Sequence, residues 1–176
     1  MKKSSLRILE MTIYSMLGTV VFSLQVVMEV FPNIHLTGMF VILYTSVFRK
    51  KALIPIYLYV MLLGIRWGFS LSWLPYLYIW LPLWGMTMLV PSHCNLKIRL
   101  FAYPLIGALH GFGFGLMYAP AQAFLFGFHW TQTLAWIAKG FPWDVIHGIG
   151  NLVICNLVVP FSALFLRLLR RTGIQP

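Results

Sequence analysis

The chain has 176 residues, of which 60% are hydrophobic and only 9% are charged, whereas soluble domains carry about 25% charged residues. Its net charge of +10 would favour nucleic acid as a partner in a soluble protein, but most basic residues lie at the ends of apolar runs. The composition excludes an ordinary soluble domain. It predicts an all-α integral membrane protein in which residues 1–176 form one compact helical bundle.

Six apolar runs follow one another, and a membrane-spanning helix needs about 20 residues. We expect transmembrane helices at residues 6–31, 35–48, 52–70, 76–90, 98–118 and 142–169. The second run is short for a span. The last is expected to begin at Pro142, because proline is favoured in the first turn of a helix. The apolar connection 119–141 is expected at the outer membrane surface.

The positions of the basic residues predict the orientation of these helices. The segments 1–7, 49–51, 91–99 and 167–176 hold 11 of the 13 Lys and Arg residues, and the alternate connections hold only Lys139. Basic residues concentrate on cytoplasmic loops of membrane proteins. We therefore expect a multi-pass protein of the cell membrane with both termini in the cytoplasm.

A polar stripe follows the start of the last expected helix. Asp144, His147 and Asn151 are spaced by three and four residues, which places them on one helix face. Asp144 would lie in the first turn, where the helix dipole favours a negative charge. Polar groups deeper in the membrane are costly unless they are satisfied, so this stripe either lines a ligand cavity or forms hydrogen bonds between helices.

Aromatic and charged side chains supply further candidates. Aromatic faces suit stacking on planar rings, although Trp and Tyr also gather at membrane interfaces without any ligand. Glu29 and Arg66 either pair with each other between the first and third helices, or one of them meets a charged group of a substrate. The aromatic set comprises Trp67, Trp73, Tyr76, Tyr78, Trp80 and Trp84.

Two stripes of small residues are spaced for close helix approach. Gly107, Gly111 and Gly115 recur every four residues and are expected to pack helices together. On the first helix, Ser15, Thr19 and Ser23 form a second ridge. It either packs inside the chain or faces a partner in the membrane.

Motifs for independent catalysis are missing from the sequence. It contains no phosphate-binding loop ending in Lys-Ser or Lys-Thr, no His-Glu-x-x-His and no Gly-x-Ser-x-Gly. We expect no enzyme activity, no cofactor and no metal. Two alternatives stay open: an intramembrane enzyme using His110, His147 and Asp144, and a small channel or scaffold whose polar groups only hold helices together.

One stretch resembles a known family. Residues 136–151, WIAKGFPWDVIHGIGN, carry Gly-x-Pro-x-Asp followed by His and Asn. This stretch resembles the start of the sixth helix in the substrate-binding S component of energy-coupling factor (ECF) vitamin transporters. The resemblance implies a six-helix protein of the prokaryotic plasma membrane that captures a small water-soluble vitamin, or a vitamin-like precursor, from outside.

The resemblance also implies sites and partners. The family's pocket is enclosed by the outer helix ends and the loops after the first, third and fifth helices, and the Asn of the sixth helix, here Asn151, often lines it. The family docks through small residues of the first helix, here Ser15, Thr19 and Ser23, onto a transmembrane coupling protein (T component) that works with two cytoplasmic ATPases. No nucleic acid is implied. The substrate-binding residues we expect are Asn151, His147, Asp144, Trp80, Trp84, Arg66, Glu29, His35 and Asn33.

Overall fold

The computed structural model describes the backbone of residues 3–31 and 33–172, and this part of the chain is helical throughout, without a strand. The all-α prediction is therefore confirmed. The first half contains α1 (Lys3–Val27), α2 (Thr37–Phe48), α3 (Leu53–Trp67) and α4 (Tyr76–Met88). Short 3-10 turns follow or connect them at Met28–Val30, Arg49–Ala52 and Leu71–Trp73.

The second half is built from two long helical runs. The first contains α5 (Leu96–Phe112) and α6 (Phe114–Phe126), which meet at Gly113. The second contains α7 (Trp130–Ile154) and α8 (Val158–Thr172), joined by the 3-10 turn Cys155–Leu157.

Three helical runs are long and apolar enough to cross a membrane: Leu6–Val30 with 25 residues, Leu96–Phe126 with 31, and Trp130–Thr172 with 43. They support the assignment to a membrane. By contrast, α2, α3 and α4 have only 12, 15 and 13 residues, which rise about 18–23 Å as α-helices. These three helices are shorter than the hydrocarbon core of about 30 Å.

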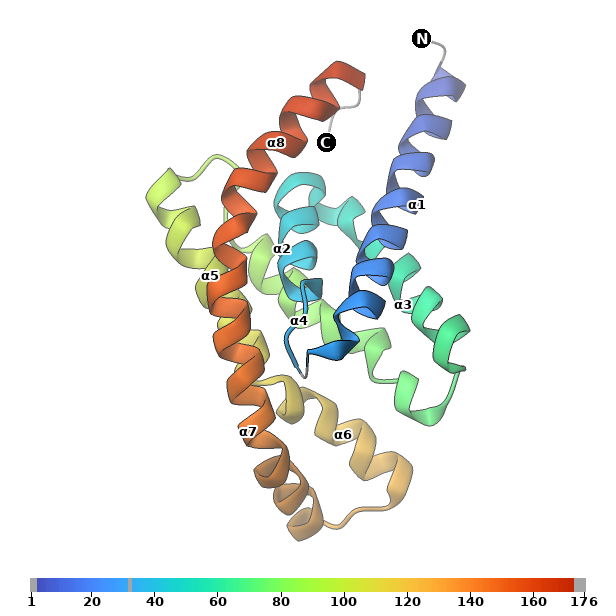
Figure 1. Cartoon of the computed structure of the whole chain (residues 1–176), viewed down its shortest axis with the longest axis vertical. Helices are drawn as coiled ribbons and strands as arrows, with labels where there is room; N and C mark the ends of the chain where they lie inside the picture. Colours follow the sequence, from blue (N-terminus) through green and yellow to red (C-terminus); the bar gives the residue numbers. More distant parts are fainter. Residues whose placement is uncertain (1–2, 32, 173–176) are drawn as a thin grey trace.

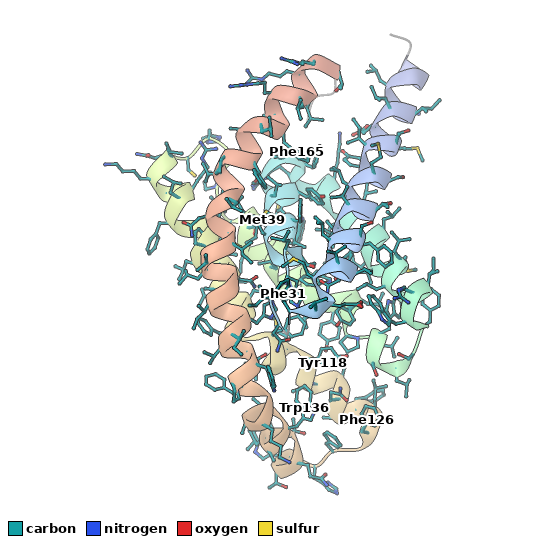
Figure 2. The ribbon with its side chains drawn as sticks, in the orientation of Figure 1. Phe31, Met39, Tyr118, Phe126, Trp136 and Phe165 are labelled. Atoms are coloured by element: carbon teal, nitrogen blue, oxygen red, sulfur yellow. The ribbon has the colours of Figure 1, made fainter. Side chains whose placement is uncertain are left out.

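The short helix α2 forms the centre of the bundle. It is apolar on every face, a pattern typical of a fully buried helix, and all its residues except Ser46 are buried. Met39, which is 1% exposed, lies in the middle of the bundle (Figure 2). The longer helices pack around this core, with α5 against α7 and α1 against α3.

The chain runs back and forth between two ends of the bundle (Figure 1). The start of α1, the α2–α3 connection, the start of α5 and the end of α8 all lie at one end. This "basic end" carries Arg49, Lys50 and Lys51 in the α2–α3 connection, and Arg170 and Arg171 in the last turn of α8. The α1–α2, α3–α4 and α6–α7 connections lie at the other end, which we call the far end.

The connection expected at residues 119–141 is instead a helical hairpin. Gly127, with a left-handed φ of 66°, ends α6, and His129 begins α7 by donating its backbone N–H to Gln132 Oε1 at 2.8 Å. The expected helix start at Pro142 is wrong, because Pro142 lies inside α7. The α6–α7 hairpin projects from the bundle at the far end (Figure 1).

Candidate functional site

A cavity of about 250 Å³ lies at the far end, and we call it the aromatic cavity. Its walls come from the end of α1, from α3, from the α3–α4 connection, and from the first turns of α4 and α6. The lining residues are Gln25, Glu29, Tyr59, Leu63, Trp67, Gly68, Ser70, Ser72, Trp73, Tyr76 and Tyr118. Five aromatic rings and several polar groups therefore face one small space.

Contacts behind the wall hold these rings in place. Trp73 Nε1 donates to the carbonyl oxygen of Val60 at 2.9 Å, and the Tyr118 hydroxyl donates to the carbonyl of Ser72. Tyr118 lies where α6 leaves the bundle (Figure 2), and its ring stacks on Trp136 of α7 with centroids 6.1 Å apart. The hairpin thus contributes directly to one wall of the aromatic cavity.

Glu29 is the one ionisable acid or base among the lining residues besides the tyrosines. Arg66 is nearby but does not line the cavity, and its guanidinium carbon lies 5.5 Å from the centroid of the Trp67 ring. The expected Glu29–Arg66 ion pair is not formed, since the ion pair that the described residues make joins Lys51 to Glu10 at 2.7 Å. Both side chains are exposed, so neither needs the other to offset burial.

Trp80 lies behind the aromatic cavity rather than on its surface. It is 4% exposed, and its ring centroid is 6.0 Å from that of Tyr59 and 6.5 Å from that of Tyr76, both of which line the cavity. On its other side, Trp80 stacks on His110 with centroids 5.6 Å apart. Trp80 therefore connects the cavity wall to a deeper group of histidines.

His35, His110 and His147 form this deeper histidine cluster. The ring of His147 packs edge-on against His35, with centroids 4.8 Å apart, and lies 6.5 Å from His110. His35 comes from the α1–α2 connection, His110 from α5 and His147 from α7. The structure thus brings together two predicted site residues, His35 and His147, from distant parts of the chain.

Each ring of the histidine cluster leaves one buried nitrogen without a protein partner: His35 Nδ1, His110 Nδ1 and His147 Nε2, together with Trp80 Nε1. His110 Nε2 lies 2.9 Å from the carbonyl oxygen of Ile79, so Nε2 carries the proton and Nδ1 keeps its lone pair. These nitrogens can bind a polar ligand group. In the described part of the chain, no three His, Cys, Asp or Glu side chains are arranged to hold a metal ion.

Asp144 has a different role from the one expected. It lies in the middle of α7, not in a first helical turn. Its Oδ2 accepts the backbone N–H of Gly115 at 3.1 Å, at the start of α6. A carboxylate is stabilised at a helix N-terminus, so Asp144 caps the neighbouring helix.

Asn151 is 1% exposed and lies between three helices. Its Nδ2 donates to the carbonyl oxygen of Gly107 on α5 at 3.1 Å, and its amide packs against Gly38 of α2. Asn151 does not line the aromatic cavity. Its contacts are those of a residue that joins helices, and its ligand-lining role stays a prediction.

Two other predicted residues also lie outside the aromatic cavity. Trp84 Nε1 donates to the carbonyl oxygen of Arg49 at 3.3 Å, in the α2–α3 connection at the basic end. Asn33 occupies the α1–α2 connection with a positive φ of 56°. The sequence therefore placed Trp84 at the wrong end, because a stripe of aromatic residues along α4 extends past the cavity.

Several lining residues were not predicted. Tyr59, Tyr118 and Gln25 come from α3, α6 and α1, and no spacing along the sequence connects them. Gln25 Oε1 accepts the hydroxyl of Thr37 at 2.7 Å, which joins α1 to α2 at the cavity. Of the aromatic residues singled out from sequence, Trp67, Trp73 and Tyr76 do line it.

The small-residue ridge on α1 faces away from the bundle. Ser15, Thr19 and Ser23 are exposed. The tight contact of α1 is made by Gly18, which is buried against α3: a Cβ there would lie 2.9 Å from the carbonyl oxygen of Pro55. The ridge is therefore open to a partner.

Comparison of the chain with protein-family models, curated proteins and solved structures gives no match.

Proposed function

We propose that the chain is the substrate-binding subunit of an ECF-type importer, embedded in a prokaryotic plasma membrane with both termini in the cytoplasm. It would capture a small water-soluble vitamin or vitamin-like precursor in the aromatic cavity. Uptake would use ATP hydrolysed by partner subunits. The proposal combines the resemblance of residues 136–151 with the position and lining of the cavity.

The position of the aromatic cavity is the observation that carries the proposal. The cavity lies at the end of the bundle opposite the basic end. If basic residues mark the cytoplasmic side, the cavity opens to the outside. Its volume of about 250 Å³ is close to the lower limit of about 300 Å³ for small-molecule pockets, which favours a compact ligand.

A six-span arrangement follows from the alternating direction of the helices in Figure 1. In this proposal α1, α2, α3, α4, α5–α6 and α7–α8 each cross the bilayer. The short helices α2–α4 are possible because surrounding protein buries much of their surface and their connections need not reach bulk water. The 43-residue run from α7 to α8 would be about 65 Å long, so the α6–α7 hairpin would extend beyond the hydrocarbon core.

The chemistry of the aromatic cavity favours one class of ligand. Five aromatic rings offer stacking surfaces, and Glu29 supplies a negative charge. Aromatic faces attract cations within about 6 Å, and no Lys or Arg side chain lines the cavity. We therefore expect a planar ligand that carries a positive charge.

Docking and energy supply would come from other subunits. The exposed ridge Ser15, Thr19 and Ser23 on α1 would allow close approach of a helix from a T component, because its side chains are short. Two cytoplasmic ATPases would complete the importer.

A thermal-shift screen of vitamins with the purified chain tests the function. We expect a vitamin with a cationic ring, such as thiamine, to stabilise the protein by about 2.7 kcal/mol at 100 times its dissociation constant. Anionic vitamins such as biotin should give no shift. The Glu29→Gln variant should lose the stabilisation, whereas Glu10→Gln, which removes a carboxylate at the basic end of α1, should keep it.

The possible results separate the function from the choice of ligand. If no vitamin stabilises the wild-type protein, the proposed function is wrong. If an anionic vitamin binds, or if the Glu29→Gln variant binds as well as the wild type, the function stands and the cationic ligand class is wrong.

A further inference from the structure

Two adjoining cavities form a groove at the basic end, between α5 and α8. Their volumes are about 400 and 220 Å³, and Arg99, Ser162 and Leu166 line both. We call this the arginine groove, because four arginines contribute to its walls. These are Arg49, Arg99, Arg167 and Arg170.

The four guanidinium groups differ in how they are satisfied. Arg49 donates to the carbonyl oxygens of Met88 and Val90, at 2.6 and 3.0 Å, where α4 ends. Arg99 has a buried Nε without a partner in the structure. Arg167 and Arg170 are exposed along the last turns of α8. The groove therefore presents positive charge that the protein satisfies only at Arg49.

No carboxylate side chain balances this charge. The chain has three acidic side chains, and all three are described and lie elsewhere. Glu10 pairs with Lys51, Glu29 lines the aromatic cavity, and Asp144 caps α6. Since like charges repel at close range, the groove favours an anion supplied from outside the chain.

The shape of the groove identifies the kind of anion. Its walls combine the arginines with the apolar residues Leu96, Val159, Ala163 and Leu166. Apolar side chains such as Leu164 and Leu168 are about half exposed on the same stretch of α8. An anion held there would thus sit beside hydrocarbon. A phospholipid fits both features, with its phosphate on the guanidinium groups and its acyl chains along α8.

We propose that the arginine groove binds the headgroup of an anionic phospholipid. Basic pockets between transmembrane helices on the cytoplasmic side suit such headgroups, and guanidinium groups bind phosphate oxygens in pairs. This inference does not depend on the proposed transport function, because it needs only a helix bundle placed in a bilayer with its basic end at one surface.

Native mass spectrometry of the purified full-length chain tests the proposal. The protein is mixed with phosphatidylglycerol or with phosphatidylcholine, and bound lipid is counted. We expect phosphatidylglycerol to remain bound at energies that strip phosphatidylcholine. The double variant Arg99→Gln with Arg167→Gln should retain at least about fivefold less phosphatidylglycerol, a difference of about 1 kcal/mol. The control Lys139→Gln removes a positive charge from the α6–α7 hairpin and should change nothing.

Two further arms distinguish other outcomes. If inorganic phosphate raises the melting temperature as much as phosphatidylglycerol does, the groove is a site for a free anion and the lipid proposal is wrong. Equal retention of phosphatidylglycerol by the wild type and the double variant also overturns it. Should the double variant fail to fold, Arg170→Gln replaces it, since Arg170 is exposed and its loss should still lower lipid retention.

Discussion

Two stripes of small residues look alike in the sequence and differ completely in the structure. On α5 and α6, Gly107, Gly111 and Gly115 are buried against the helical run that begins with α7. A Cβ at Gly111 would lie 2.7 Å from the backbone of Gly148. On α1, by contrast, Ser15 and its two ridge partners are exposed and touch no other helix tightly.

The difference shows what small residues specify. Short side chains let two helix backbones approach closely, but they do not say which helix approaches. The glycine stripe is closed by the chain itself, whereas the serine–threonine ridge is left open. The close contact of α1 with its own chain uses Gly18, on a neighbouring face.

The largest effect is expected where the glycine stripe is tightest. Gly111→Ala places a methyl group against the backbone of Gly148, which cannot rotate away. We expect the two helices to separate slightly and the protein to lose about 1–3 kcal/mol of stability, as overpacked cores do. Thermal unfolding of the purified variant measures this loss.

Gly140→Ala is the matched control on α7. A Cβ at Gly140 would meet no atom within 4 Å, and alanine is favoured over glycine inside a helix by about 0.5–1 kcal/mol. This variant should therefore be as stable as the wild type or more so. Equal destabilisation by both substitutions would show that the α5–α7 contact is not the tight one.

Asn151→Ala should have a smaller effect, and it tests the role of the residue beside the glycine stripe. The variant loses the hydrogen bond to the carbonyl of Gly107, which contributes about 0.5–1.5 kcal/mol net. We expect a lower melting temperature and a change in ligand affinity of less than about twofold. Asn156→Ala, whose amide is exposed and bonds within its own helix, should change stability by less than about 0.5 kcal/mol.

The ECF resemblance predicts the opposite result for Asn151. If the residue lines the ligand pocket, the affinity falls markedly while the empty protein keeps its melting temperature. Measuring ligand binding and thermal unfolding on the same variant separates the two roles, and a selective loss of affinity would show that the packing interpretation is wrong.

The sequence predicted the helices better than their ends. Apolar runs mark where α1 to α5 lie, because a chain in lipid must satisfy its backbone within helices. The start of α7 was missed because its cues are unusual: His129 is not a common N-cap residue. Pro142 looked like a first-turn residue and instead sits within a continuing helix. Basic residues correctly predicted which connections share one end.

The candidate site was predictable only in part. Trp67, Trp73 and Glu29 line the aromatic cavity as expected, since they lie near the far ends of their helices. Tyr59 and Tyr118 reach the same space from different helices, and only the three-dimensional packing brings them together. Asp144 was recognised as a helix cap, but the helix it caps is a different one.

The open ridge on α1 gives the smallest expected effect on the chain itself. Thr19→Trp places a large side chain on an exposed helix face, where substitutions usually change stability by less than about 0.5 kcal/mol. The melting temperature and ligand affinity of the isolated chain should stay unchanged. Assembly with a T component, followed by co-purification, should nevertheless be lost, because the indole keeps the partner helix away.

A control on α8 makes this last prediction specific. Leu164 is about half exposed, and Leu164→Trp adds a similar bulk to a surface outside the ridge, so its assembly should be normal. If Thr19→Trp assembles normally as well, α1 is not the docking helix. If Thr19→Trp instead unfolds the isolated chain, the ridge packs inside the protein. In that case the contrast between a closed glycine stripe and an open ridge is wrong, because both stripes would then be closed by the chain itself.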